Sequence, residues 1–381
     1  MFGHYFCPFG LCFIFLKNRV FVATEIGFMR KIEPIHSERD LAVAVENKLR
    51  SDKDLSWRIT RGEPGNDKTR ADAIVHLKFG GKDLTFLAEF KLKPTADLIE
   101  TLGHRASPRD HPWLLVTPRL SERFVELCRK SGVACLDLNG RVWIRRGTVL
   151  VDRSPQANGE SVIATPPEPD LVSNKGSRVL RAFLSSHRPW TQAELATATG
   201  VSRPLLSKLL ETLVQQGYVR REGGVRGGTW TLAQPDALLD EWTRRDIWSR
   251  RAVVQQYSIL VPALEAAAKQ LPAAFGASRF AFTQWYAAQL RHPYTESPVL
   301  SVYTEESPSA DLLKALNARE VPSGGRLWLI RPRDEGVFQF IQTVDGLPLV
   351  SDAQIYLDLL QVGQRGPDAA DALRHWEGFR Q

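Results

Sequence analysis

The segment AELATATGVSRPLLSKLLETLVQQGYV, residues 193–219, decides how the middle of this chain folds. Thr191 lies just before it, and Glu194 follows three residues later, which is the capping-box pattern of a helix start. Gly200 and Val201 then form a turn. The segment therefore predicts a short helix over 191–200 that ends at a glycine.

A second helix is expected directly after the turn. Ser202 is predicted to cap it, with Pro204 in its first turn and Gly217 after its end. Leucines recur at helical spacing and form an inward stripe, namely Leu205, Leu206, Leu209, Leu210 and Leu213. An earlier helix is predicted over 177–186, so that the order is helix, helix, glycine turn, helix.

The residues after these helices predict a hairpin. Residues 218–232 (YVRREGGVRGGTWTL) hold two short β-rich runs around glycines. The hairpin would complete a winged helix-turn-helix. The run quoted above resembles the winged helix-turn-helix of bacterial transcription regulators from the second helix to the wing.

This module predicts a surface for double-stranded DNA. Residues 176–234 carry eight Lys and Arg against three Asp and Glu, a balance of +5. The first turns of the third helix would enter the major groove, with Arg203 on a base edge and Lys208 and the wing arginines on phosphates. The candidate DNA-binding residues are Ser202, Arg203, Ser207, Lys208, Arg220, Arg221 and Arg226. No cofactor is expected for this binding. A winged helix that only docks protein, with solvated charges, is the alternative.

Composition limits the class of protein. The 381 residues are 43% hydrophobic and 24% charged, and this balance predicts folded domains rather than a disordered polymer or a membrane channel. The four cysteines form no CxxC pair or zinc-binding pattern, and a reducing cytoplasmic setting fits them best. The net charge of +7 permits a polyanionic partner.

Five segments are predicted. They are an N-terminal extension (1–30), a first domain (31–153), a linker rich in Pro, Ser and Asn (154–175), the winged helix (176–234) and a C-terminal domain (235–381). The extension holds an apolar stretch, residues 5–16, that is too short to span a bilayer and lacks the flanks of a signal peptide. Two interpretations of these residues remain open. Either the start is assigned too far upstream of Met29, or the residues form an extension that binds a membrane or docks a partner.

The first domain places acidic residues on neighbouring strands. Residues 37–130 predict the order helix, three strands, helix, strand, helix. Asp72 begins the second strand, and Glu89 and Lys91 share one face of the third because residues two apart on a strand project together. The other face would hold an apolar row, namely Phe86, Ala88, Phe90 and Leu92.

This pattern resembles the PD-(D/E)xK nuclease fold, also called restriction-endonuclease-like, although Ala71 stands where that family often has proline. The resemblance implies that Asp72 and Glu89 would hold Mg²⁺, with Lys91 as the charge partner and Glu46 or Glu38 as an extra ligand. A metal held by carboxylates polarises phosphate and activates its bound water. The alternatives are a solvated face that arises by chance and a retained fold that only binds.

The C-terminal region predicts a mixture of helices and strands. Long helical material is expected over 236–271, strands near 299–304 and 327–330, a hairpin near 338–344, and closing helices. Three pieces, at 280–290, 325–338 and 350–374, resemble the C-terminal domain of the AbiEi antitoxins of type IV toxin–antitoxin systems. In the last piece and the end of the chain, Tyr356, Asp358 and Trp376 are expected mainly to pack and cap helices.

The AbiEi resemblance implies a partner and a role. Its members bind inverted repeats in their own promoter, repress the operon, and counter a nucleotidyltransferase-like toxin without a stable complex. Better-known members begin with the winged helix, whereas here it is internal. That departure affects the antitoxin role more than the regulator role.

The sequence thus predicts an α/β multidomain protein, with an N-terminal restriction-endonuclease-like domain, a central winged helix-turn-helix and a C-terminal α/β AbiEi-like domain. The leading hypothesis is a DNA-binding regulator of the AbiEi type without a membrane partner. The second is a Mg²⁺-dependent DNA nuclease targeted by the winged helix, and the third is a protein-binding scaffold. The sequence leaves the operator, the toxin and the oligomeric state open, with a homodimer as one arrangement.

Overall fold

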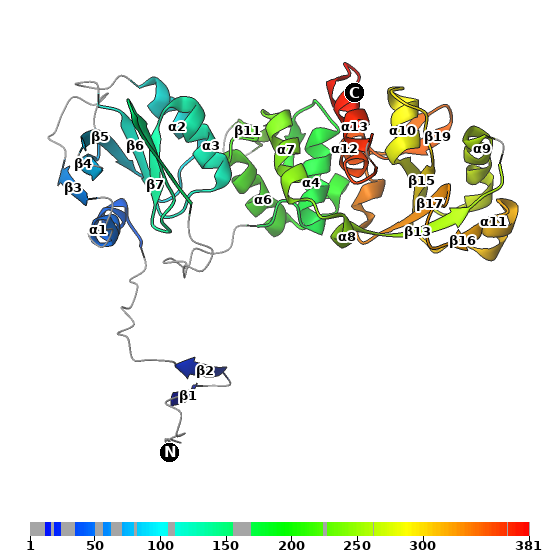
Figure 1. The fold of residues 1–381 in the computed structure, drawn as a ribbon, viewed down its shortest axis with the longest axis horizontal. Coiled ribbons are helices and arrows are strands. Elements are labelled where there is room, and N and C mark those ends of the chain that lie inside the picture. Colours follow the sequence, from blue (N-terminus) through cyan, green and yellow to red (C-terminus); the bar gives the residue numbers. More distant parts are fainter. Residues whose placement is uncertain are drawn as a thin grey trace. The chain divides into compact units, whose positions relative to one another are not determined.

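A computed structural model gives the fold of the chain (Figure 1). It describes residues 12–16, 19–23, 35–49, 56–61, 71–79, 82–105, 111–154, 169–223, 227–261, 263–363 and 365–380. The chain divides into two compact units, one of residues 1–92 with 102–165 and one of residues 93–101 with 166–381. No helix in these described ranges is long and apolar enough to cross a membrane.

A seven-stranded sheet with the order β3-β4-β5-β6-β7-β8-β9 forms the centre of the first unit. Its two ends are antiparallel, whereas β5, β6 and β7 run parallel. The strands are β3 (Ser56–Arg61), β4 (Ala73–Phe79), β5 (Lys82–Phe90), β6 (Trp113–Thr117), β7 (Ala134–Asp137), β8 (Val142–Arg146) and β9 (Val149–Arg153). The helices of this unit are α1 (Glu38–Leu49) and α3 (Glu122–Ser131), whereas most of α2 (Ala96–His104) belongs to the second unit in this division. This confirms the predicted element order of residues 37–130.

One face of this sheet forms an apolar core with α1. Leu41 and Val45 of α1 pack in one buried cluster with Phe86, Ala88 and Phe90 of β5. The predicted apolar row on β5 is therefore confirmed for these three residues. Figure 1 shows α1 on one side of the sheet and α3 on the other.

Two predicted segments are only partly described. Within the predicted extension, β1 (Cys12–Leu16) and β2 (Arg19–Ala23) pair as an antiparallel hairpin, and the other residues of 1–30 lie outside the described part. Residues 155–168 of the predicted linker also lie outside it.

The winged helix-turn-helix has the predicted elements. They are α4 (Asn174–Leu184), α5 (Gln192–Thr199), α6 (Arg203–Gln215), β11 (Val219–Glu222) and β12 (Thr229–Leu232). A short strand that sequence reasoning missed, β10 (Trp190–Thr191), joins them in a sheet of order β10-β12-β11. The start of α5 is thereby tied to the wing.

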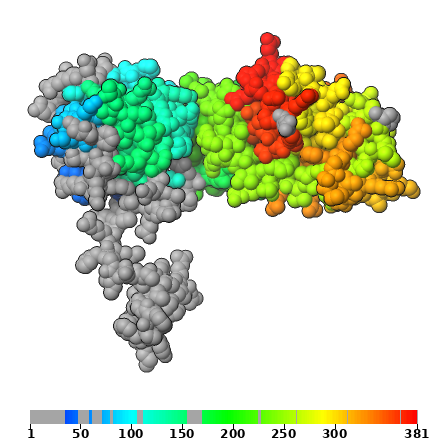
Figure 2. Space-filling view, in the orientation of Figure 1, coloured from blue at the N-terminus to red at the C-terminus, as the bar shows by residue number. Residues whose placement is uncertain are grey.

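A second seven-stranded sheet organises the rest of the second unit, with the order β16-β13-β17-β15-β14-β19-β18. Its strands are β13 (Ala252–Ser258), β14 (Phe280–Thr283), β15 (Leu300–Thr304), β16 (Arg319–Val321), β17 (Leu327–Pro332), β18 (Gln342–Val344) and β19 (Leu347–Leu349). The helices are α7 (Pro235–Arg245), α8 (Trp248–Arg251), α9 (Leu264–Phe275), α10 (Gln284–Arg291), α11 (Ala310–Ala315), η2 (Glu335–Phe338), α12 (Asp352–Leu359) and α13 (Gly366–His375). In Figure 2, red α12 and α13 lie against yellow α10.

Two local predictions in this region are wrong. The long helical material expected over 236–271 is interrupted by β13, because its backbone pairs with β16 on one side and β17 on the other. The hairpin expected near 338–344 lies further on, between β18 and β19. Its turn is Asp345-Gly346, where both residues have positive φ (51° and 76°), the conformation favoured in two-residue hairpin turns. This Asp-Gly pair was the signal that could have placed it.

The winged helix and the C-terminal sheet share one apolar core. A single buried cluster runs from Leu180 and Phe183 of α4 through Trp242 of α7 to Ile355 and Leu357 of α12. In Figure 2 the green winged helix packs directly against the C-terminal region. The helices α4 and α6 are therefore held by the same packing that holds the C-terminal sheet.

Candidate nucleic-acid interface

The start of α5 is fixed by local hydrogen bonds. The Thr191 side chain accepts from the Glu194 backbone N–H at 3.2 Å, and the Glu194 carboxylate accepts from the Thr191 backbone N–H at 2.7 Å, so the predicted capping box is confirmed. Arg188 also donates to Glu194, at 2.8 Å. The hydrogen bonds from Thr191, then the one from Arg188, lower the pKa of Glu194 to about 2.

The turn after α5 sets the direction of α6. Gly200 adopts a left-handed conformation with φ of 63°, which glycine tolerates without strain. Val201 is buried, and Ser202 stands at the start of α6, although its side chain makes no capping hydrogen bond. The predicted N-cap position of Ser202 is therefore confirmed, but its side chain contributes no hydrogen bond to the helix start.

The leucine stripe of α6 faces the core, so its polar residues face outward. Leu206, Leu209, Leu210 and Leu213 are buried, whereas Leu205 is only half-buried. The outward set is Ser202, Arg203, Ser207 and Lys208, all exposed. Among the described residues, Arg203 and Lys208 form no ion pair with a carboxylate. The start of α6 thus presents two uncompensated cations.

Contacts from neighbouring elements complete this surface. Gln192 at the start of α5 donates to Ser207 at 2.6 Å, which ties the two helices together on their outer side. Arg220 and Arg221 lie exposed on β11, and the Arg221 guanidinium sits 5.3 Å from the centre of the Trp230 ring. Arg226, also predicted to bind DNA, lies outside the described residues.

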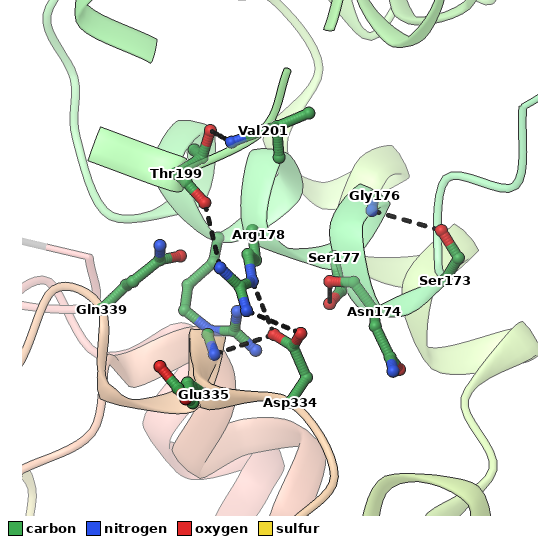
Figure 3. Close-up of polar contacts among 12 residues, drawn as sticks. Ser173, Asn174, Gly176, Ser177, Arg178, Thr199, Val201, Asp334, Glu335 and Gln339 are labelled. Carbon is green, nitrogen blue, oxygen red and sulfur yellow. Dashed lines mark hydrogen bonds and ion pairs between the residues drawn. The ribbon is translucent and has the colours of Figure 1, made fainter. Parts of the chain in front are cut away.

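The end of α5 is held from the C-terminal region, which sequence reasoning missed (Figure 3). Arg178 of α4 forms two hydrogen bonds of 2.8 Å with the carboxylate of Asp334 and donates to the Thr199 carbonyl at 3.4 Å. Gln339 donates to the Ala198 carbonyl at 3.0 Å. The hydrogen bonds to Asp334 raise the pKa of Arg178.

A buried polar network lies beside this contact. Arg181 of α4 is fully buried and donates to Gln354 of α12 at 2.6 Å. Gln354 donates to Asp358 at 2.8 Å, and Asp358 also accepts from Arg251 and Thr283. Desolvation lowers the pKa of Arg181 to about 10.

The aromatic and acidic residues near the end of the chain pack as expected. Asp358 is fully buried in the network just described. Tyr356 meets the Phe379 ring edge-on, and Trp376 stacks on His292. These residues therefore have structural partners within the C-terminal region.

The residues of the first unit that the sequence predicts as metal ligands and charge partner also come together. Lys91 lies 3.2 Å from Glu89 and 3.0 Å from Glu38, and Arg105 lies 3.9 Å from the other oxygen of Glu89. Asp72 accepts from the Phe90 backbone N–H at 2.9 Å. Burial first, and then the nearby Asp72 charge, raise the pKa of Glu89. The structure thus brings Glu38, one of the two predicted extra ligands, into the cluster, and the role of the other, Glu46, stays a prediction.

The chemistry of this cluster bears on metal binding. Mg²⁺ is commonly held by one or two carboxylates, with waters completing its coordination, and Asp72 and Glu89 supply such oxygens. Within the described ranges, no group of three His, Cys, Asp or Glu is placed to hold a metal ion. Asp72 and Glu89 supply two carboxylates, but each Glu89 oxygen lies beside a cation, Lys91 or Arg105, so these contacts would have to change for Glu89 to bind a metal ion.

Comparison with known families covers the second unit. Residues 174–223 match the family model of the IclR helix-turn-helix domain, and residues 231–377 match that of the transcriptional regulator, AbiEi antitoxin, type IV TA system. The chain therefore carries an IclR-type helix-turn-helix domain followed by an AbiEi-type antitoxin domain. No curated protein and no solved structure gives a significant match.

The capping box yields a prediction about α5. Thr191→Ala should lower the free energy of local opening of α5 by about 1 kcal/mol at pH 7, because the Glu194 backbone N–H loses its acceptor. Amide hydrogen exchange of α5 measures this, with Thr191→Ser as the control that keeps the hydroxyl. Equal exchange in the alanine variant and the wild type would contradict it.

The same cap should weaken in acid. The pKa of Glu194 is lowered from 4.5 to about 2 in the folded chain, so its stabilisation is complete above about pH 4.5 and is lost as the pH falls through about 2. We expect α5 protection in the wild type to fall over this window relative to Glu194→Gln. A parallel pH profile in both proteins would show that Glu194 plays no part.

Lys91 should set the titration of Glu89. Among the groups near Glu89, Lys91 does the most to lower its pKa. Lys91→Met should therefore raise that pKa further above its ordinary value. Carbon NMR of the glutamate carboxyl groups follows the titration. Lys130→Met, which removes an exposed lysine paired with Glu126 on α3, is the matched control and should leave Glu89 unchanged. An unchanged Glu89 titration in the Lys91 variant would refute the assignment.

Proposed function

We propose that this chain is a DNA-binding transcriptional regulator of the AbiEi antitoxin type that binds duplex upstream of its own gene and represses its operon. The observation that carries the proposal is the exposed start of α6, where Arg203 and Lys208 have no carboxylate partner within the described residues. The two family matches support it, because a helix-turn-helix model and an AbiEi antitoxin model follow one another in the second unit.

The geometry of α6 suits a major groove. An α-helix fits that groove, and the side chains of its first turns reach base edges. Arg203 and Ser207 are four residues apart and lie on one face of α6, with Lys208 beside them. In this proposal Arg203 binds a base edge, while Lys208, Arg220, Arg221 and Arg226 neutralise phosphates on either side.

The AbiEi-type domain adds the second part of the proposal. The matched family is described as an antitoxin, and we propose that residues 231–377 counter a nucleotidyltransferase-like toxin encoded beside this gene. Co-expression of such a neighbour with and without this chain tests it. Growth arrest by the neighbour that this chain fails to relieve would remove the antitoxin role and leave the regulator role standing.

DNA binding is tested with the upstream duplex of the chain's own gene. Arg203→Ala should weaken specific binding by about 1–3 kcal/mol, because a base contact is lost. Lys208→Ala should weaken binding to all sequences alike and lower the salt slope of the affinity by about 1, because one phosphate contact is lost. Gel shifts over a series of salt concentrations measure both effects.

The control is Lys269→Ala, which removes an exposed lysine of α9 and should bind as the wild type does. Unchanged affinity in both the Arg203 and Lys208 variants would reject the proposed surface. Binding that does not weaken as salt rises would favour the protein-scaffold hypothesis, because phosphate contacts must weaken as counterions compete.

A Mg²⁺-dependent DNA nuclease is the second candidate function. The observation that favours it is the cluster of Glu38, Asp72, Glu89 and Lys91 beside the end of β5. Asp72 and Glu89 would hold the ion, which when bound would polarise a phosphate and activate water. The positive charge of Lys91 would stabilise negative charge on the phosphate. Burial keeps the Glu89 carboxyl away from bulk water.

Cleavage assays separate this candidate from the regulator. The purified chain is incubated with plasmid, single-stranded and branched DNA in Mg²⁺ or Mn²⁺, beside Glu89→Ala and Glu126→Ala. A nuclease at this site predicts cleavage that the Glu89 variant loses and the Glu126 variant keeps. Cleavage that survives in the Glu89 variant would point to a contaminant, and an absence of cleavage would leave the cluster as a structural ion-pair network.

A further inference from the structure

Two of the last carbonyl groups of α5 accept hydrogen bonds from side chains outside α5. A helix leaves its final carbonyls without intrahelical partners, and a helix of eight residues has little stability of its own. The Gly200 backbone N–H donates a hydrogen bond to the Ala196 carbonyl at 3.0 Å. The Ala198 carbonyl accepts from Gln339, and the Thr199 carbonyl accepts from Arg178. One of these two donors therefore belongs to the C-terminal region.

Asp334, in the same region, holds the other donor in place. Its carboxylate accepts both Arg178 hydrogen bonds at 2.8 Å and also accepts from the Gly336 backbone N–H at 2.8 Å. The two side chains are mostly buried, with 14% and 17% exposed. A paired, planar contact of this kind fixes direction as well as distance. Figure 3 shows Asp334, Arg178 and the Thr199 carbonyl in one connected chain of contacts.

The same short segment also reaches the beginning of α5. The ring of Phe340 meets the ring of Trp190 edge-on, with 6.2 Å between their centres. Phe340 adopts φ of 59°, a conformation that bulky residues rarely take, so surrounding contacts must hold it. Phe340 and Gln339 therefore contact the chain on either side of α5, at Trp190 just before it and at Ala198 near its end.

We infer that Asp334 and Gln339 are positioning residues for DNA binding, which hold the end of α5 and thereby set where α6 begins. The inference rests on the proposed regulator function. Gly200 and Val201 alone separate the end of α5 from Ser202, so a shift of that end moves Arg203 as well. A base contact depends on such a position, whereas phosphate contacts by flexible lysines and arginines tolerate a shift.

The test uses the full chain and two duplexes, the upstream operator and an unrelated sequence of equal length. Asp334→Ala and Gln339→Ala should each weaken operator binding about tenfold and leave binding to the unrelated duplex and the salt slope unchanged. The control is Glu335→Ala, which removes an adjacent exposed carboxylate that pairs with Arg279 and makes no hydrogen bond to α4 or α5 in the described residues. It should bind both duplexes as the wild type does.

A double-mutant cycle shows whether Asp334 acts through Arg178. Because the two side chains form one unit, Arg178→Ala with Asp334→Ala should bind the operator no worse than Arg178→Ala alone. Additive losses would overturn the inference. If circular dichroism shows that Asp334→Ala does not fold, Gln339→Ala and Asp334→Asn replace it in the test. Operator affinity equal to that of the wild type in both variants overturns the inference.

Failure of the inference differs from failure of the proposed function. A wild-type chain that binds both duplexes equally or not at all refutes the regulator function, and the positioning role falls with it. A wild-type chain that prefers the operator, together with alanine variants at 334 and 339 that keep the preference, refutes only the positioning role.

Discussion

The buried guanidinium of Arg181 is the constraint on which the packing of the second unit depends. A charge taken out of water is costly unless acceptors and opposite charges surround it. Arg181 has Gln354 as its acceptor, and Asp334 and Asp358 act on it electrostatically. Since Arg181 is on α4 and Gln354 is on α12, the winged helix must dock where that acceptor lies. Burial of the surrounding apolar cluster stabilises the contact between α4 and α12 but is non-directional. The hydrogen bond between Arg181 and Gln354 fixes how the two helices are placed.

Charge compensation separates the two clusters that sequence reasoning selected. In the first unit Lys91 and Arg105 face Glu89, and Lys91 also faces Glu38, so both of these glutamates are paired with cations. On α6, Arg203 and Lys208 are exposed and form no ion pair with a carboxylate of the described residues. A cation without an ion-pair partner attracts a polyanion strongly. The field of a paired cation is largely cancelled by its carboxylate. This contrast favours the start of α6 as the surface for DNA.

Local signals made the helix-turn-helix predictable. Thr191 with Glu194, the turn glycine and the leucine spacing all act within a few residues, and the structure repeats them. Strand alternation likewise placed Glu89 and Lys91 together. The strand β13 was not predictable in this way, because partners in β16 and β17 that lie more than 60 residues away make it a strand. Arg178 and Asp334 are 156 residues apart, and no local pattern links an arginine on α4 with an aspartate after β17.

Chain order and packing divide the second unit differently. The two family models follow chain order and meet between residues 223 and 231, at the wing. The apolar cluster does not divide there, since it includes α4 on one side of that boundary and α7 and α12 on the other. Arg178 and Arg181 lie in the first model, and their partners Asp334 and Gln354 lie in the second. A substitution in the AbiEi-type domain can therefore alter the position of α5 without changing its sequence, because the end of α5 accepts a hydrogen bond from Gln339 of that domain.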